Sequence, residues 1–269
     1  MPRSQPLPER VRYVAFAHGY QSRMPLRSPR LLLIPAAMVA VLVVGVGSAA
    51  APPMGLRAKP AIAGNTYDRL KARGTPVAMI VRPTALWSAP GGRRLAVLDT
   101  VTRWRSPRVL PALSRRGGWL KVLATELPNG DTAWIRSSAV RLLPNPWSVV
   151  ADLSSRRVTV RRNGRVVHRF DVAVGARATP TPTGRFAVTD KLALTGGSPA
   201  YGCCALALNG HQPNLKQGWR GGDRLAIHGT TELGTIGQAA SLGCLRARDS
   251  DARWVIQNVL LGTVVEIRR

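Results

Sequence analysis

One His and one Cys lie sixteen positions apart in the C-terminal third of the chain. His228 is followed by Gly229, and Cys244 is preceded by Gly243. A thiol becomes a useful nucleophile when a base or a positive field removes its proton, because the thiolate attacks. Glycine beside each residue allows close backbone approach and positive φ, which suits a nucleophile whose neighbouring N–H groups face a developing oxyanion. The alternative is a buried cysteine and a surface histidine that never meet.

The residues upstream of this histidine predict mostly β structure. Two strand-like runs flank Asn163-Gly164, which is the strongest short-range hairpin signal. His168, in the second run, is interpreted as a solvent-facing strand residue. The stretch 191–222 predicts a long irregular loop, a kind of segment that is usually functional. A short strand at 223–227 then delivers the histidine.

Downstream of the cysteine the pattern becomes helical. Asp249 and Ser250 can cap a helix in which Val255 and Val259 pair at i, i+4. Residues 263–267 predict a closing strand. The chemistry-bearing part of the chain is therefore expected to be mainly β with one short helix.

An earlier segment, 76–144, carries short apolar runs broken by turns. About 70 residues of this kind with no helical period predict a small β-barrel or sandwich. Pro128-Asn-Gly-Asp131 predicts a turn between two of its strands, and its tryptophans are interpreted as core residues. The pattern Trp119-Leu-Lys-Val followed by Ala133-Trp-Ile resembles the bacterial SH3-like modules of cell-wall proteins. The expected strands are 77–81, 86–87, 95–98, 119–123, 133–135 and 140–143, and the tryptophans are Trp87, Trp104, Trp119 and Trp134.

The N-terminal region predicts export. Residues 1–30 form a basic tail with six Arg and one Glu, which we expect to be disordered and cytoplasmic. Residues 31–51 carry no charge, and about 20 apolar residues span a bilayer as a helix. The Arg excess before them predicts that the N-terminus stays inside, and a cleavable signal peptide is the alternative. In both cases the rest of the chain lies outside the cytoplasm, with 52–75 as a linker.

The formal charge of +26 arises from 39 basic and 13 acidic residues. Such a field attracts polyanions. Nucleic acid is not favoured as a partner, because the sequence has no Lys/Arg-rich helix, zinc-finger spacing or aromatic stacking motif. Anionic polymers of a cell envelope, or a bias toward Arg with no partner, explain the charge better.

The chain has three cysteines, and an odd number leaves a free thiol in an oxidising compartment. Cys203 and Cys204 are adjacent, and adjacent cysteines rarely pair without strain. A packing role for these small side chains is favoured over an oxidised pair. A zinc site with His211 is favoured least, because adjacent ligands do not match the usual Cys spacing. No metal or cofactor is expected.

Four sequence blocks together closely resemble the L,D-transpeptidase catalytic domain of the YkuD type, and their order and spacing fit from 147 to 269. The resemblance implies a catalytic β-sandwich with a short helix. The blocks are Thr181-Pro-Thr-Gly-Arg-Phe186, Tyr201-Gly202, Ile227-His-Gly-Thr230 and Ser241-Leu-Gly-Cys-Leu-Arg246.

The resemblance implies an enzyme that remodels peptidoglycan and needs no cofactor. Its Cys attacks the carbonyl of an L-residue, typically the diamino acid at stem position three, and expels the following D-Ala. An amine of a neighbouring stem peptide then takes the acyl group, which gives a 3→3 cross-link. Water as the acceptor would give an L,D-carboxypeptidase, and a non-catalytic wall-binding protein is a further alternative.

The resemblance also assigns roles to individual residues. Cys244 is the nucleophile, and His228 is the base, held by the Gly229 carbonyl in the way a carboxylate holds the His of Ser-His-Asp sites. Many members of this family have His where this chain has Leu242, so the electrostatics around the thiol are expected to differ. The remaining assignments are Ser241 in the catalytic motif, the N–H groups of Gly243 and Cys244 in the oxyanion hole, and Tyr201, Arg246 and Thr230 in substrate binding.

Overall fold

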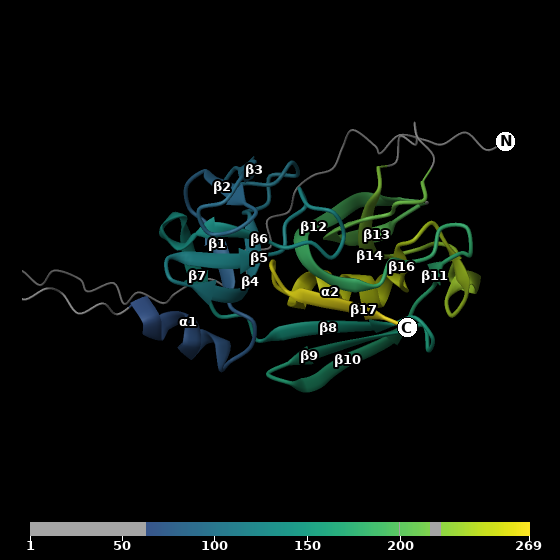
Figure 1. Ribbon diagram of the computed structural model, residues 1–269. Coiled ribbons are helices and arrows are strands. Elements are labelled where there is room, and N and C mark those ends of the chain that lie inside the picture. Colours follow the sequence, from purple (N-terminus) through teal and green to yellow (C-terminus); the bar gives the residue numbers. More distant parts are fainter. Residues whose placement is uncertain (1–62, 199, 216–221) are drawn as a thin grey trace, which may run out of the picture. The chain divides into compact units, whose positions relative to one another are not determined.

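The computed structural model describes residues 63–198, 200–215 and 222–269, and Figure 1 shows their arrangement. The basic tail 1–30, the apolar segment 31–51 and the first part of the predicted linker lie outside these residues. Within the described part of the chain, no helix is both long and apolar enough to span a bilayer.

The first sheet has seven strands in the order β3-β2-β6-β5-β4-β1-β7, and every pairing is antiparallel. Its core holds fully buried Leu86, Leu120 and Ile135. The prediction of an all-β unit here is confirmed, while its SH3-like character stays a prediction. The strands are β1 (Val77–Ile80), β2 (Thr84–Trp87), β3 (Arg94–Leu98), β4 (Val109–Arg116), β5 (Trp119–Val122), β6 (Ala133–Arg136) and β7 (Val140–Leu143), with the 3-10 turn η1 (Ser137–Ala139) before β7.

Two features of this sheet differ from the sequence prediction. Strand β4 was not predicted, because it contains Pro111, and proline removes a ladder donor. Of the four tryptophans interpreted as core, Trp119 alone is buried. Arg136 lies over the face of this ring at 3.8 Å, and Arg103 lies 4.7 Å from the ring of half-exposed Trp104. At Trp104, contact with an arginine thus covers aromatic surface that the core does not bury.

The helix α1 (Ala63–Lys71) lies within residues 52–75, which are predicted to be a linker, and it was not predicted. Its Tyr67 is 6% exposed and joins the core of the first sheet. The Tyr67 hydroxyl donates to the Ala112 carbonyl at 3.3 Å. Packing of one aromatic side chain therefore stabilises a helix that the local sequence pattern does not predict.

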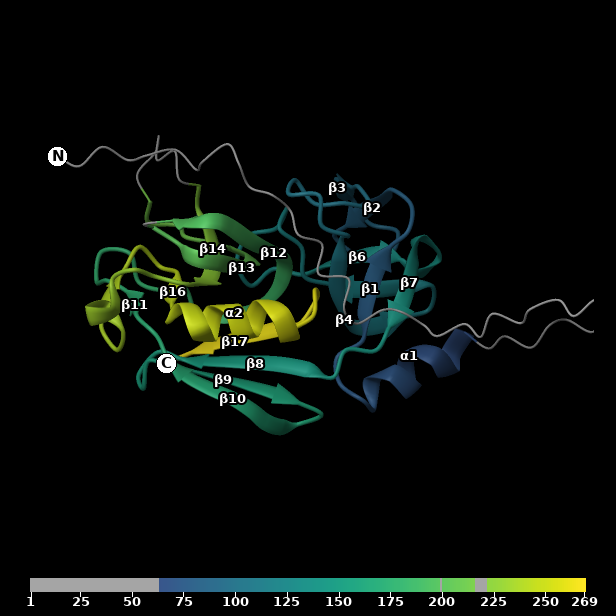
Figure 2. The same cartoon turned by 180° about the vertical axis from the view of Figure 1, so that it is seen from behind.

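The second sheet carries the predicted chemistry and has eight strands in the order β10-β9-β8-β17-β12-β13-β14-β16. Strand β17 runs parallel to β8 and antiparallel to β12, and β16 runs parallel to β14. Figure 2 shows the helix α2 (Asp249–Asn258) beside β17, and its buried Val255 and Ile256 join the core of this sheet. The strands are β8 (Trp147–Asp152), β9 (Arg157–Arg162), β10 (Arg165–Asp171), β12 (Gly184–Ser198), β13 (Gly202–His211), β14 (Arg224–His228), β16 (Leu245–Arg246) and β17 (Val264–Arg268), and a separate parallel pair joins β11 (Val174–Gly175) to β15 (Ala239–Ser241).

The predicted hairpin around Asn163-Gly164 is confirmed. Both residues have positive φ, 51° and 75°, as a two-residue turn of this kind requires. The interpretation of His168 as solvent-facing is wrong. A register shift between Val166 and His168 turns the ring toward Trp254, on which it stacks with centroids 4.3 Å apart.

The prediction of an irregular loop over 191–222 is wrong for most of its length. The structure forms two long antiparallel strands there, β12 and β13, whose Leu206 and Leu208 are buried. Glycine in this stretch serves packing, since a Cβ on Gly210 would lie 2.5 Å from the ring of Phe186. The glycines that suggested a loop instead let an aromatic ring pack against a strand.

Candidate active site

The cysteine predicted to react lies in a tight turn between β15 and β16. The Ser241 hydroxyl donates to the Cys244 carbonyl at 2.6 Å, and the Gly243 N–H donates to the same hydroxyl oxygen at 3.0 Å. Gly243 has φ +113°, in the region that favours glycine. Ser241 therefore closes the turn that presents the thiol. Leu242, in the same turn, is 46% exposed.

The predicted base stands at the end of β14, and its side chain is 3% exposed. His228 Nδ1 lies 2.6 Å from the Gly229 carbonyl oxygen, so Nδ1–H donates to it and Nε2 keeps its lone pair. The parallel pairing of β14 with β16 places His228 opposite Arg246 and Ile227 opposite Leu245. This register brings the turn that carries Cys244 beside the strand that carries the histidine.

Burial keeps both the His228 imidazole and the Cys244 thiol neutral near pH 7. It lowers the pKa of His228 to about 4, against the opposing effects of the Gly229 carbonyl and the Asp249 carboxylate. It raises the pKa of Cys244 to about 11, although a backbone hydrogen bond from Ala226 favours the thiolate. The resting pair is thus a thiol and an imidazole, not an ion pair. A reaction of this thiol with the imidazole as its base would require the proton to pass from sulfur to nitrogen during attack.

The predicted substrate-binding residues have different surroundings. The ring of Tyr201 meets the His228 ring edge-on with centroids 4.9 Å apart, and burial raises the pKa of its hydroxyl. Arg246 Nη1 pairs with Glu232 Oε2 at 2.5 Å. Thr230 is buried, and its hydroxyl accepts the Glu232 N–H at 3.1 Å. Tyr201 therefore borders the base, Arg246 already holds a carboxylate, and Thr230 shapes the turn between them.

The two N–H groups predicted to form an oxyanion hole have different surroundings. The N–H of Gly243 donates to Ser241 Oγ. The N–H of Cys244 has no acceptor among the residues that the structure describes. In this conformation the cysteine's own N–H is the available donor of the pair.

Three residues near the site escaped sequence reasoning. Gln212 is 4% exposed, and its Nε2 donates to the carbonyls of Thr179 and Pro180 at 3.2 and 3.0 Å. A Cβ on Gly243 would lie 2.1 Å from this Nε2, so the amide packs directly under the turn. Asp249 and Glu232 are the other two. No sequence signal marked Gln212 or Glu232, while Asp249 was noticed solely as a helix cap.

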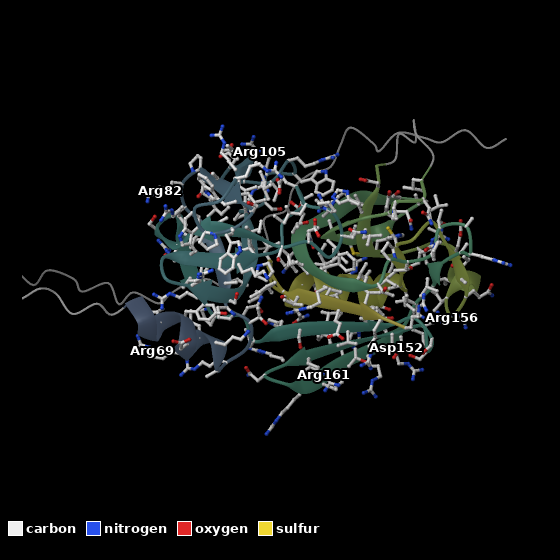
Figure 3. All side chains as sticks on the ribbon, in the orientation of Figure 1. Arg69, Arg82, Arg105, Asp152, Arg156 and Arg161 are labelled. Atoms are coloured by element: carbon white, nitrogen blue, oxygen red, sulfur yellow. A yellow bond between two sulfur atoms is a disulfide. The ribbon has the colours of Figure 1, made fainter. Side chains whose placement is uncertain are left out.

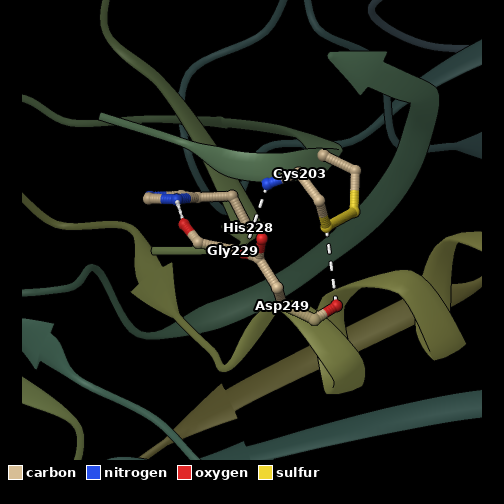
Figure 4. The surroundings of a disulfide bond; sticks show 5 residues. Cys203, His228, Gly229 and Asp249 are labelled. Carbon is tan, nitrogen blue, oxygen red and sulfur yellow. Dashed lines mark hydrogen bonds between the residues drawn. A yellow bond between two sulfur atoms is a disulfide. The ribbon is translucent and has the colours of Figure 1, made fainter. Parts of the chain in front are cut away.

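The adjacent cysteines form an oxidised pair, which corrects the preference for a packing role. Figure 4 shows the bond between Cys203 and Cys204 beside the His228-Gly229 turn. Cys204 accepts the Gly229 N–H through its carbonyl at 3.0 Å. Across the described residues, no group of three or more His, Cys, Asp or Glu side chains is arranged to hold a metal ion.

Known proteins resemble this half of the chain. Residues 146–267 match the family described as the L,D-transpeptidase catalytic domain. YkuD of Bacillus subtilis (strain 168) is 32% identical over 124 residues, which are 46% of this chain and 67% of that protein. YkuD of Bacillus licheniformis is 30% identical over 122 residues, 45% of this chain and 66% of that protein. The chain thus spans about two thirds of the length of each relative.

Solved structures of L,D-transpeptidases are more distant. One from Mycobacterium smegmatis is 17% identical with a TM-score of 0.40, covering 71% of this chain and 99% of that one. One from Mycobacterium tuberculosis H37Rv is 18% identical with a TM-score of 0.41, covering 77% and 86%. Likeness at this level adds no weight, and the assignment depends on the sequence matches. On those matches, this chain belongs to the YkuD family of L,D-transpeptidases.

Proposed function

We propose that this chain is a cysteine-dependent peptidoglycan L,D-transpeptidase that forms 3→3 cross-links. One observation carries the proposal: His228 donates from Nδ1 to the Gly229 carbonyl, and the adjacent parallel strand begins directly after Cys244. That hydrogen bond leaves Nε2 as the basic atom. A base of fixed tautomer beside a thiol is the minimum that acyl transfer through a cysteine needs.

The reaction begins with a neutral pair. The Cys244 proton moves to His228 Nε2 as sulfur attacks the carbonyl of the L-residue at stem position three. Collapse of the tetrahedral intermediate breaks the peptide bond to D-Ala, whose amine takes the proton from the imidazolium. His228 then accepts a proton from the acceptor amine as it attacks the thioester, and gives this proton to the departing sulfur, which leaves as the Cys244 thiol. Each half-reaction returns the base to its starting state.

The oxyanion is stabilised by the N–H of Cys244. In other enzymes one such donor lowers the barrier by roughly 2.7 to 4 kcal/mol. Gly243 acts differently, since its N–H holds Ser241 and thereby fixes the turn. Loss of that bond during reaction would free a second donor.

Arg246 and Tyr201 bind the donor stem peptide. The bond between Arg246 and Glu232 supports this assignment, because a guanidinium fork that already binds one carboxylate has suitable geometry for another. A substrate carboxylate would displace Glu232, which is more exposed than the arginine. Tyr201 covers the base from the side.

The proposed substrate lies outside the cytoplasmic membrane, so the proposal requires export. Residues 31–51 are the proposed anchor or signal peptide, and 76–144 the proposed SH3-like module. The Arg-rich chain is proposed to contact anionic envelope polymers as well. Fractionation of cells that express a C-terminally tagged chain tests the location, and recovery from the cytoplasm would contradict it.

The activity is tested with Cys244→Ala in the full chain. We expect the parent, but not the variant, to gain the mass of a carbapenem β-lactam in intact-protein mass spectrometry. Muropeptides from cells with the parent should contain 3→3 cross-links. Trimmed stem peptides without cross-links would assign the carboxypeptidase reaction instead. Equal labelling of parent and variant would contradict the proposed nucleophile.

A further inference from the structure

The carboxylate of Asp249 does not cap its own helix. The N-cap of α2 is Arg248, and this helix start has no side-chain capping bond. Asp249 Oδ1 reaches across to β13, where it accepts the Cys203 N–H at 3.2 Å, as Figure 4 shows. The predicted role of Asp249 as a helix cap is therefore wrong, and its carboxylate can serve a different role.

This oxygen lies directly against two glycines. A Cβ on Gly229 would stand 2.0 Å from Asp249 Oδ1, and a Cβ on Gly202 would stand 2.2 Å from it. Real contacts of this kind are never so short, so any side chain at either position would displace the carboxylate. Gly229 is not among the residues with positive φ. Space for Asp249, and not backbone conformation, explains glycine at this position.

The same glycine orients the base. The Gly229 carbonyl accepts from His228 Nδ1 at 2.6 Å, while its N–H donates to the Cys204 carbonyl at 3.0 Å. Gly229 is thus held by its hydrogen bond to β13 and lies against the Asp249 carboxylate. Movement of the carboxylate would let Gly229, and with it the imidazole ring, change position.

The carboxylate also supplies charge at the right place. Burial and Arg246 both disfavour the imidazolium form of His228, while Asp249 and the Gly229 carbonyl favour it. The base must carry a positive charge once it has taken the thiol proton. A fixed negative charge close to it stabilises that state without occupying the ring nitrogen that does chemistry.

We propose that Asp249 is a positioning residue for the base: it holds the Gly229 peptide that orients His228 and stabilises the imidazolium that forms. This inference rests on the proposed function. The proposed role of the Asp249 carboxylate is indirect, because it acts on the His228 ring through the Gly229 carbonyl. The reacting atoms are not touched by Asp249, so its effect must be seen in the behaviour of His228.

The experiment compares two acids in the first turn of the same helix. Asp251 pairs with His168 on the other side of α2, so Asp251→Asn and Asp251→Ala remove the same charge from the same helix end. The test variants are Asp249→Asn, which keeps an oxygen acceptor, and Asp249→Ala. All are made in the full chain and checked for folding by circular dichroism.

The first readout is release of D-Ala from a tetrapeptide stem. We expect Asp249→Ala to lower kcat by roughly 10²-fold, the smaller end of what a general base contributes, with little change in KM. Asp249→Asn should keep part of this rate, and the Asp251 variants should stay within about twofold of the parent. Equal losses at both positions would assign the effect to the helix end and overturn the proposal.

The second readout does not depend on activity. The Nδ1-bound proton and the titration of His228 are followed by ¹⁵N NMR of the ring nitrogens. We expect Asp249→Asn to lower the pKa of His228 further and Asp249→Ala to weaken the Nδ1–H signal, with both features unchanged in Asp251→Asn. If the parent releases no D-Ala, the proposed function fails while this measurement still decides the inference. Parent-like His228 spectra in both Asp249 variants would overturn it.

Discussion

The two halves of the site are positioned by different means, although each depends on a glycine packed under a polar side chain. On the base side, Gly229 has ordinary φ and needs room for Asp249. On the nucleophile side, Gly243 needs positive φ and also room for Gln212. His228, the proposed base, is therefore fixed by packing, and Cys244, the proposed nucleophile, by backbone conformation as well. This difference predicts which defects a second mutation can repair.

The largest expected effect comes from adding one methyl group to each glycine. Gly229→Ala and Gly243→Ala should both lower the free energy of unfolding, because each new Cβ overlaps a buried polar side chain. Adding Asp249→Ala should restore most of the stability of Gly229→Ala. Adding Gln212→Ala should relieve the overlap in Gly243→Ala, but the double variant should stay less stable than Gln212→Ala alone. The remaining difference in unfolding free energy is about 1–2 kcal/mol, the cost of a left-handed backbone with a Cβ.

Urea unfolding of the single and double variants measures this contrast. The single Asp249→Ala and Gln212→Ala variants serve as the references for each cycle. If both second mutations restored stability equally, lack of space alone would explain why glycine is needed at both positions. The distinction between the two halves of the site would then be wrong.

The two halves should also respond to opposite ends of the pH scale. Because the folded-state pKa of His228 is lowered to about 4 from its ordinary 6.5, the unfolded chain binds more protons between these values, and stability falls as pH decreases through this window. The folded-state pKa of Cys244 is raised to about 11 from 9.0, so stability falls as pH increases between those values. Each limb has a slope of at most about 1.4 kcal/mol per pH unit.

Unfolding free energies measured from pH 4 to pH 11 test both limbs. His228→Gln should flatten the acid limb and leave the alkaline one, and Cys244→Ala should do the reverse. An acid limb that is unchanged in His228→Gln would show that other groups, such as surface carboxylates, dominate it.

Ser241 tests how firmly the nucleophile side is held. Its hydroxyl accepts the Gly243 N–H and donates to the Cys244 carbonyl. Ser241→Ala leaves buried groups without partners, a cost of about 1–3 kcal/mol, so kcat/KM should fall roughly 10- to 100-fold if the loss appears in the transition state. Ser154→Ala, which removes an exposed hydroxyl bonded to Asp152, is the matched control and should not change the rate.

The smallest expected effect concerns the exposed ion pair beside the base. Glu232→Gln weakens the contact with Arg246 and should lower KM for the donor stem a few-fold, since exposed pairs contribute up to about 1 kcal/mol. Glu266→Gln removes an exposed acid from the central strand β17 and should have no effect. A higher KM in Glu232→Gln would mean that this carboxylate assists binding instead of competing with it.

The sequence predicts local geometry well where one signal decides it. Asn163-Gly164 specifies a hairpin turn because few other dipeptides adopt positive φ at both positions. The strand before His228 and the helix after Asp249 were also predictable from pattern alone. The resemblance of four short blocks identified the family without any knowledge of packing.

What escaped prediction depends on contacts between distant segments. Gly210 suggested a loop, yet it lies in a strand because the Phe186 ring packs against it. The side chains of Gln212 and Asp249 form hydrogen bonds to other segments of the chain, and neither residue type predicts such a contact. His168 turned inward because of a register shift that alternation alone does not reveal.

Strand β17 has a consequence for the nascent chain. It is the most C-terminal strand of the structure, yet it lies between β8 and β12 in the sheet. In the sheet, β17 pairs with β8 on the side of the hairpin β9-β10 and with β12 on the side of β14, which carries His228. Synthesis of Cys244 therefore precedes completion of the sheet. A chain still emerging from the ribosome therefore carries its thiol before the sheet beside it is complete, because β17 (Val264–Arg268) is made later.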